Sequence, residues 1–166
     1  MADFNAAILR TLAKEGGAKI TEIAGDSGGL TKYGISQRSY PNVNIRALTE
    51  QQARNIYKRD YWGRICGDRI DAQPIAESIF DCAVNMGVKT TIKLAQSALN
   101  ATLVKQIPVD GDMGDMTLSA LSKCGSSVFI ASFTLLKIAR YAAICNKDKT
   151  QSKFLLGWIN RSMGSH

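Results

Sequence analysis

A glutamate and an aspartate each precede a glycine pair near the start of the chain, and a threonine follows them. The stretch reads AKEGGAKITEIAGDSGGLTKYGIS over residues 13–36 and contains Glu15, Asp26 and Thr31. Hydrolysis of a glycosidic bond needs a protonated carboxyl group for the leaving oxygen, and a second group that holds and activates water. We therefore take Glu15 as a candidate general acid, and Asp26 and Thr31 as candidates for holding the water.

The spacing of apolar residues predicts that Glu15 ends a helix on its apolar side. Phe4, Ile8 and Leu12 recur every four residues, and Glu15 follows three residues later. Apolar surroundings raise the pKa of a carboxyl group by penalising its charged form, as a general acid requires. The glycine pair after it predicts the helix end, and the following segment has the composition of a short antiparallel hairpin.

A purely structural interpretation of the same residues stays open. Glu15 could be a solvent-facing residue at a helix end, and Asp26 a turn former in GDSGG. Variants with altered side chains at these positions distinguish the two interpretations.

Composition excludes histidine chemistry. The single histidine is His166, the last residue, which removes histidine-activated nucleophiles and the common zinc sites. The four cysteines show no C-x-x-C spacing, so we interpret them as buried reduced thiols. The DGDMGD turn over residues 110–115 lacks the glycine and glutamate positions of a calcium loop. We therefore expect no metal and no cofactor.

A predicted helix over residues 73–87 carries two polar residues four positions apart. Asp81 and Asn85 share a face that is distinct from the stripe of Ile75 and Ile79. The pair could line a cleft and bind sugar groups, or could form a solvated polar face.

Aromatic side chains offer a second kind of sugar contact, because they stack on sugar rings. Tyr33 and Tyr61 are the candidates for this role. Aromatic residues at helical spacing also pack in cores, and this alternative applies to Tyr57, Trp62 and Trp158.

Helical spacing dominates the rest of the chain, so we predict a mainly α fold with one small β element near the candidate acid. Further helices are expected over residues 48–62, 90–103, 116–124, 128–145 and 152–163. Thr49 and Gln52 form a capping-box pattern. We interpret 128–145 as a central buried helix, because Lys137 and Arg140 interrupt its apolar run before the length of a membrane span.

The formal net charge of +7 implies an anionic partner. Nucleic acid, a membrane surface and an acidic wall polymer all meet that description. The basic residues are spread along the chain and only YKRDYWGR resembles a cluster, which disfavours nucleic acid.

Taken in order, the motifs resemble the phage endolysin and N-acetylmuramidase family catalogued as glycoside hydrolase family 108. The first half is similar in EGG, DSGGLTKYGIS, ARNIYKRDYW and FDCAVNMG. The second half resembles an accompanying peptidoglycan-binding part in AQSALN, VDGDMGDMTLSAL and KFLLGWINRSM. The resemblance implies one α+β, lysozyme-like domain over 1–166, with a catalytic half 1–88 packed against a peptidoglycan-binding helical half 89–166.

The resemblance also implies an activity, with Glu15 as the catalytic acid. Asp26 and Thr31 would position the attacking water, as in the distantly related phage lysozymes, and Asn85 would line the cleft. The implied reaction is hydrolysis of the β-1,4 bond between N-acetylmuramic acid and N-acetylglucosamine in bacterial peptidoglycan. A lytic transglycosylase and a non-catalytic wall-binding module are the alternatives.

The opening stretch MADFNAAILRTLAKEGG bears on where the protein acts. It has an acid at position 3 and no uninterrupted apolar stretch, so we do not expect a secretory signal. We expect a monomer without stable membrane insertion, kept in the bacterial host cytoplasm until membrane permeabilisation gives it access to the wall in the periplasm.

Overall fold

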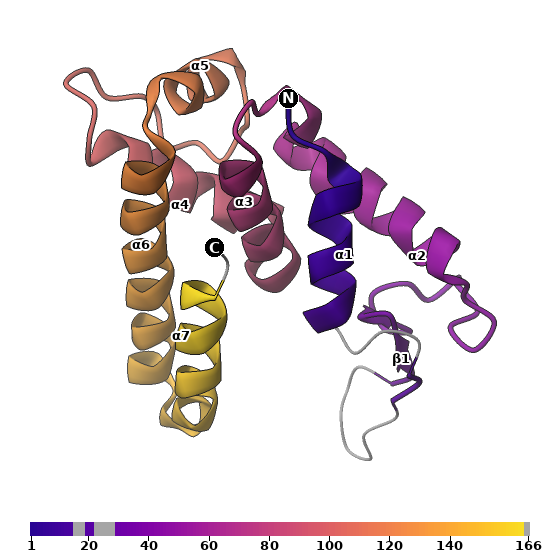
Figure 1. Cartoon of the computed structure of the whole chain (residues 1–166). Coiled ribbons are helices and arrows are strands. Elements are labelled where there is room, and N and C mark those ends of the chain that lie inside the picture. Colours follow the sequence, from indigo (N-terminus) through magenta and orange to yellow (C-terminus); the bar gives the residue numbers. More distant parts are fainter. Residues whose placement is uncertain (15–18, 22–28, 165–166) are drawn as a thin grey trace.

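The structure is a computed structural model, and it describes residues 1–14, 19–21 and 29–164. Its described part is mainly helical, with a small two-stranded antiparallel sheet, as the sequence predicts (Figure 1). The α-helices are α1 Phe4–Lys14, α2 Glu50–Tyr57, α3 Gln73–Met86, α4 Val88–Asn100, α5 Asp115–Lys123, α6 Ser126–Lys147 and α7 Leu155–Met163. The strands are β1 Thr31–Lys32 and β2 Ile35–Ser36. A π-helix Lys58–Trp62 extends α2, and short 3-10 helices span Gly63–Ile65, Gly67–Arg69 and Lys149–Phe154.

The predicted capping box starts α2. The Gln52 backbone N–H donates to Thr49 Oγ1 at 3.2 Å, and the Thr49 N–H donates to Gln52 Oε1 at 2.9 Å. Two amide groups that have no partner inside the helix are thereby satisfied. The start of α2 is therefore set locally, by residues that are close in sequence.

The limits of α3 also follow from local sequence. Pro74 lies in the first turn, where its missing N–H is harmless. Gly87 ends the helix with a φ of 83°, a conformation that favours glycine.

The core of the first half is centred on the indole of Trp62, which is fully buried. Its ring centroid lies 5.6 Å from that of Phe4 in α1, and 5.5 Å from that of Phe80 in α3 in an edge-to-face arrangement. The indole N–H donates to Asp68 Oδ1 at 2.8 Å, so burial leaves no unpaired polar atom on the ring. Three segments that are distant in sequence thus meet on one side chain.

The DGDMGD stretch forms the predicted turn, and a buried glutamine holds it. Gln96 of α4 donates from Nε2 to Asp110 Oδ1 at 2.7 Å, and its Oε1 accepts from the Gly111 N–H at 2.9 Å. Asp115 begins α5 and pairs with Arg69 at 2.7 Å. The acidic side chains Asp110 and Asp115 are therefore already engaged within the protein.

The prediction that residues 128–145 form a central buried helix was wrong. One stripe of α6 is buried, formed by Phe129, Phe133, Lys137, Tyr141 and Cys145. The helix packs against α4 and α7 along that stripe, and its opposite side faces outward (Figure 1). Leu135 is 68% exposed on this outer side. By length and composition alone, α6 meets the requirements for a membrane-spanning helix.

The close contact between Gly67 and Trp62 yields a stability prediction. A Cβ at Gly67 would overlap the Trp62 indole, so Gly67→Ala should lower the free energy of unfolding by about 1–3 kcal/mol. A thermal unfolding curve should show a drop of roughly 2–4 °C for each kcal/mol.

The matched control is Gly157→Ala in α7, where nothing lies within 4 Å of the added Cβ. This change should raise stability by up to about 1 kcal/mol, because alanine favours a helix. Equal midpoints for the wild type and Gly67→Ala would contradict this account of the core.

Candidate active site

Two of the candidate catalytic residues, Glu15 and Asp26, lie outside the described residues. The helix that leads to the first of them is described: Phe4, Ile8 and Leu12 are all buried on one face of α1. α1 ends at Lys14, and in Figure 1 this end lies at the same end of the molecule as β1. The expected apolar face therefore extends to Leu12, three residues before Glu15.

Thr31, the third candidate, lies at the start of the small hairpin. It pairs with Ser36 across the hairpin and forms an isolated bridge with Thr21. The N–H of each of Thr21 and Thr31 donates to the carbonyl of the other at 2.9 Å. The backbone of half-buried Thr31 is thus paired with Ser36 on one side and with Thr21 on the other. This pairing fixes the position of the Cβ atom that carries the hydroxyl group.

The hairpin turn brings Tyr33 into contact with α2. Tyr33 and Gly34 have φ values of 53° and 75°, as expected of a tight two-residue hairpin turn with positive φ at both positions. The Tyr57 hydroxyl donates to the Tyr33 carbonyl at 2.9 Å. This bond holds a residue in an unusual backbone conformation, with its ring half-buried.

Tyr61 lies in the π-helix that follows α2. Its half-buried ring lies 5.6 Å from the ring of buried Tyr57. π-helical turns are rare and often occur at functional sites. Tyr57 therefore contacts both residues: its hydroxyl group binds the Tyr33 carbonyl, and its ring packs against the ring of Tyr61.

A hydrogen-bonded group joins the segment after the hairpin to the same π-helix. The Tyr40 hydroxyl donates to Asp60 Oδ2 at 2.9 Å, and Arg59 Nε donates to Asp60 Oδ1 at 2.6 Å. The Arg59 hydrogen bond is the largest cause that lowers the pKa of Asp60. Burial and the bond to Asp60 raise the pKa of Tyr40. The charged Asp60 carboxylate thus braces the loop against the helix.

Asp81 and Asn85 lie on α3 as predicted, and both contact the second half of the chain. Asp81 is buried, and its carboxylate accepts from Arg161 Nη2 at 3.2 Å and Nε at 3.3 Å. The Asn85 side-chain amide donates to the hydroxyl group of Tyr141 in α6. Asp81 is thereby engaged in an ion pair. Asn85 is exposed, and its amide is held by the hydrogen bond to Tyr141.

Sequence analysis did not identify Tyr141 and Arg161 as partners of these residues. They lie 56 and 80 residues further along the chain, so no local spacing signals either contact. Trp158 stacks on Tyr141 with ring centroids 4.8 Å apart and stays partly exposed. An aromatic pair thus lies next to Asn85, and it comes from the second half of the chain.

Metal ligation finds no support in the described part of the chain, where no group of three His, Cys, Asp or Glu side chains could hold an ion. The four cysteines have free thiols, two of them buried and two partly exposed.

Two family models match the chain in succession. The model described as glycosyl hydrolase 108 matches residues 8–87, and the model described as a predicted peptidoglycan domain matches residues 90–163. The chain belongs to the glycosyl hydrolase 108 family. It is a glycosidase that acts on peptidoglycan.

A solved structure of SagA from Brucella abortus shares the fold of this glycosyl hydrolase 108 protein. The TM-score is 0.79 and the identity is 25%, over 98% of this chain and 90% of the SagA chain. No curated protein matches this sequence. The mainly α, lysozyme-like fold class is confirmed by these similarities and by the element order.

The Tyr141 contacts yield a pH prediction for this glycosyl hydrolase 108 protein. Burial raises the pKa of the Tyr141 phenol from 10.0 to about 12. Between those values the folded chain keeps a proton that the unfolded chain has lost, so the free energy of unfolding falls as the pH rises. Below pH 10 this contribution is fully present. Burial also raises the pKa of Cys82, from 9.0 to about 11. This shift adds to the decrease in the free energy of unfolding at alkaline pH.

Urea unfolding at steps from pH 9 to pH 12 should therefore show decreasing stability. In Tyr141→Phe the decrease above pH 10 should be shallower, because the titrating phenol is gone. An identical slope in the variant and the wild type would show that Tyr141 does not carry this effect.

Proposed function

We propose that the protein is an N-acetylmuramidase. It hydrolyses the β-1,4 bond between N-acetylmuramic acid and N-acetylglucosamine in peptidoglycan. The observation that carries the proposal is the glycosyl hydrolase 108 match over residues 8–87, which contains Glu15, Asp26 and Thr31. The buried face of α1, whose last apolar member is Leu12, supports an apolar setting for the acid.

In the proposed reaction Glu15 is the general acid. Its carboxyl group donates a proton to the oxygen that leaves with N-acetylglucosamine. Water attacks the anomeric carbon of N-acetylmuramic acid from the opposite face. Asp26 takes the proton of that water, and the Thr31 hydroxyl group helps to hold it. Burial in apolar surroundings keeps a carboxyl group protonated near neutral pH.

The proposal extends to the contacts with the substrate. Exposed Asn85 binds a sugar amide or hydroxyl group, and the partly exposed rings of Tyr33 and Tyr61 contact the sugar faces. Asp81 contributes to the substrate site indirectly, through its ion pair with Arg161 of α7. The second half of the chain then supports the substrate site, in addition to the wall binding that its family match suggests.

We also propose the biological role of an endolysin. The net charge of +7 favours association with an anionic wall. The protein accumulates in the bacterial cytoplasm and reaches the wall after the membrane is permeabilised. It acts as a monomer without stable insertion into the membrane.

The catalytic role of Glu15 is tested by Glu15→Gln. The amide is nearly isosteric but cannot donate a carboxyl proton, so clearing of a purified wall suspension should fall by at least about 10²-fold. Circular dichroism and the unfolding midpoint should stay at wild-type values. Near wild-type clearing by the folded variant would refute the mechanism.

The products test the role of the second carboxyl group. Water held by Asp26 attacks opposite the leaving group, so the new N-acetylmuramic acid end should first appear as the α anomer in proton NMR. This inverting geometry requires a separation of about 6.5–9.5 Å between the two carboxyl groups, against about 5–5.5 Å for a retaining enzyme.

Two other product patterns would contradict that mechanism. An initial β anomer would remove water activation from Asp26 and keep the hydrolase. A 1,6-anhydro end in mass spectra would arise from attack by the muramic acid's own hydroxyl group, and would make the protein a lytic transglycosylase.

A further inference from the structure

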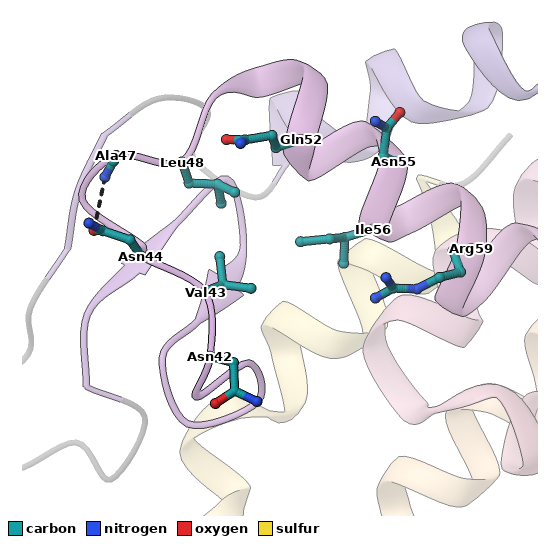
Figure 2. Close-up of a pocket in the computed structure, with 9 residues that line it drawn as sticks. All are labelled: Asn42, Val43, Asn44, Ala47, Leu48, Gln52, Asn55, Ile56 and Arg59. Atoms are coloured by element: carbon teal, nitrogen blue, oxygen red, sulfur yellow. Dashed lines mark hydrogen bonds between the residues drawn. The ribbon is translucent and has the colours of Figure 1, made fainter.

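A pocket of about 650 Å³ lies between α2 and the loop that precedes it (Figure 2). We propose that this pocket binds the carboxylate groups of the peptide stems of peptidoglycan. The choice of stem peptides as the ligand rests on the proposed function. The pocket itself is defined by residues outside the candidate catalytic set.

Three of the four side-chain amides that line the pocket use their oxygens within the protein; the fourth, Asn42, is not part of this set. Asn44 Oδ1 accepts from the Ala47 N–H at 3.3 Å, the bond drawn in Figure 2. Gln52 Oε1 accepts from the Thr49 N–H at 2.9 Å. Asn55 Oδ1 accepts from Gln51 Nε2 at 3.0 Å.

The amino groups of these three side chains remain available. No partner among the described residues accepts a hydrogen bond from Asn44 Nδ2, Gln52 Nε2 or Asn55 Nδ2. Each amino group carries two N–H donors. The rim of the pocket therefore offers N–H donors from three amide groups.

Arg59 adds a positively charged donor to the same rim. Its Nε and Nη2 donate to Asp60 at 2.6 Å and 2.7 Å, which fixes the plane of the guanidinium group. Nη1 has no acceptor in the part of the chain that the structure describes, and the side chain is 69% exposed. In Figure 2 this side chain extends from the π-helix that follows α2 toward the space beside Ile56.

Hydrogen bonds within the protein hold both sides of the pocket. Gln37 Nε2 donates to the carbonyls of Pro41 and Val43, each at 3.0 Å, and so holds the start of the loop. The capping box holds the start of α2 on the other side. Binding would then require little ordering of the protein, which favours affinity.

These properties match a short acidic peptide better than a sugar. Val43, Leu48 and Ile56 provide an apolar lining that suits small aliphatic side chains (Figure 2). A sugar is neutral and forms no ion pair with Arg59. A carboxylate accepts only, and hydrogen bonds to it are strengthened by its charge. Peptide stems combine free carboxylates, backbone carbonyls and small side chains, whereas the glycan strand itself is the substrate of the catalytic residues.

The experiment uses Gln52→Glu, a change that reverses the polarity of the rim without losing the helix cap. Glutamate serves equally well at this position of a capping box, and its charge favours a helix N-terminus. The unfolding midpoint should therefore stay the same or rise. Binding of a free stem peptide, measured by calorimetry on the full chain, should weaken at least about tenfold because like charges repel.

The matched control is Gln106→Glu, which makes the same change at an exposed position in the second half of the chain. It should bind the stem peptide as the wild type does. In assays of cleavage, Gln52→Glu should raise KM for a glycan oligomer that carries stems and leave the rate on a stem-free oligomer unchanged.

Equal affinity of the wild type and Gln52→Glu for the peptide would overturn the proposal, and so would absence of peptide binding by the wild type. Displacement of the bound peptide by a stem-free glycan would assign the pocket to sugars instead. The calorimetric result does not depend on catalysis. A wild-type protein that binds the peptide but cleaves neither oligomer would refute the muramidase and retain the peptide site.

Discussion

The arrangement of the first half depends on burial of the Trp62 indole. This ring packs against Phe4 of α1 and Phe80 of α3, and its N–H is satisfied by Asp68. Because burying a tryptophan without a partner for its N–H would be unfavourable, the 3-10 helix that carries Asp68 must follow closely. Gly67 is required there, since any side chain would overlap the ring.

Docking of α1 on this ring has a consequence for catalysis. The helix buries Phe4, Ile8 and Leu12 on one face and ends at Lys14. In the proposed mechanism Glu15 directly follows this helix, and a general acid needs a defined place and a low dielectric. The proposed activity would therefore depend on the packing of α1.

The two matched segments are joined by specific polar contacts as well as by apolar packing. Asp81 pairs with Arg161, and Asn85 is braced by Tyr141. Arg69 of the first half pairs with Asp115 of the second. The peptidoglycan-domain segment thus packs directly on the glycosyl hydrolase 108 segment. Substitutions of Tyr141 in α6 or Arg161 in α7 would therefore remove contacts of Asn85 or Asp81 in α3.

The sequence by itself determined the features that depend on neighbouring residues. The capping box at Thr49, the helix over residues 73–87 and a short antiparallel hairpin after the first helix were all predicted, because their hydrogen bonds span only a few residues. The mainly α class and the order of the helices followed from the spacing of apolar residues. The family was also evident, because its motifs are contiguous in sequence.

Only the tertiary structure decided which partners the polar groups take. The ion pair of Asp81 joins residues 80 positions apart, and no periodicity carries that information. The exposure of one side of α6 was not predicted either. Hydropathy records how apolar a helix is, but not which of its sides other elements cover. The N–H donors beside α2 likewise follow from hydrogen bonds that orient the amides of Asn44 and Gln52 by their oxygens. Amide side chains are symmetric in their hydrogen-bonding capacity, and only their folded surroundings decide which half of each remains free.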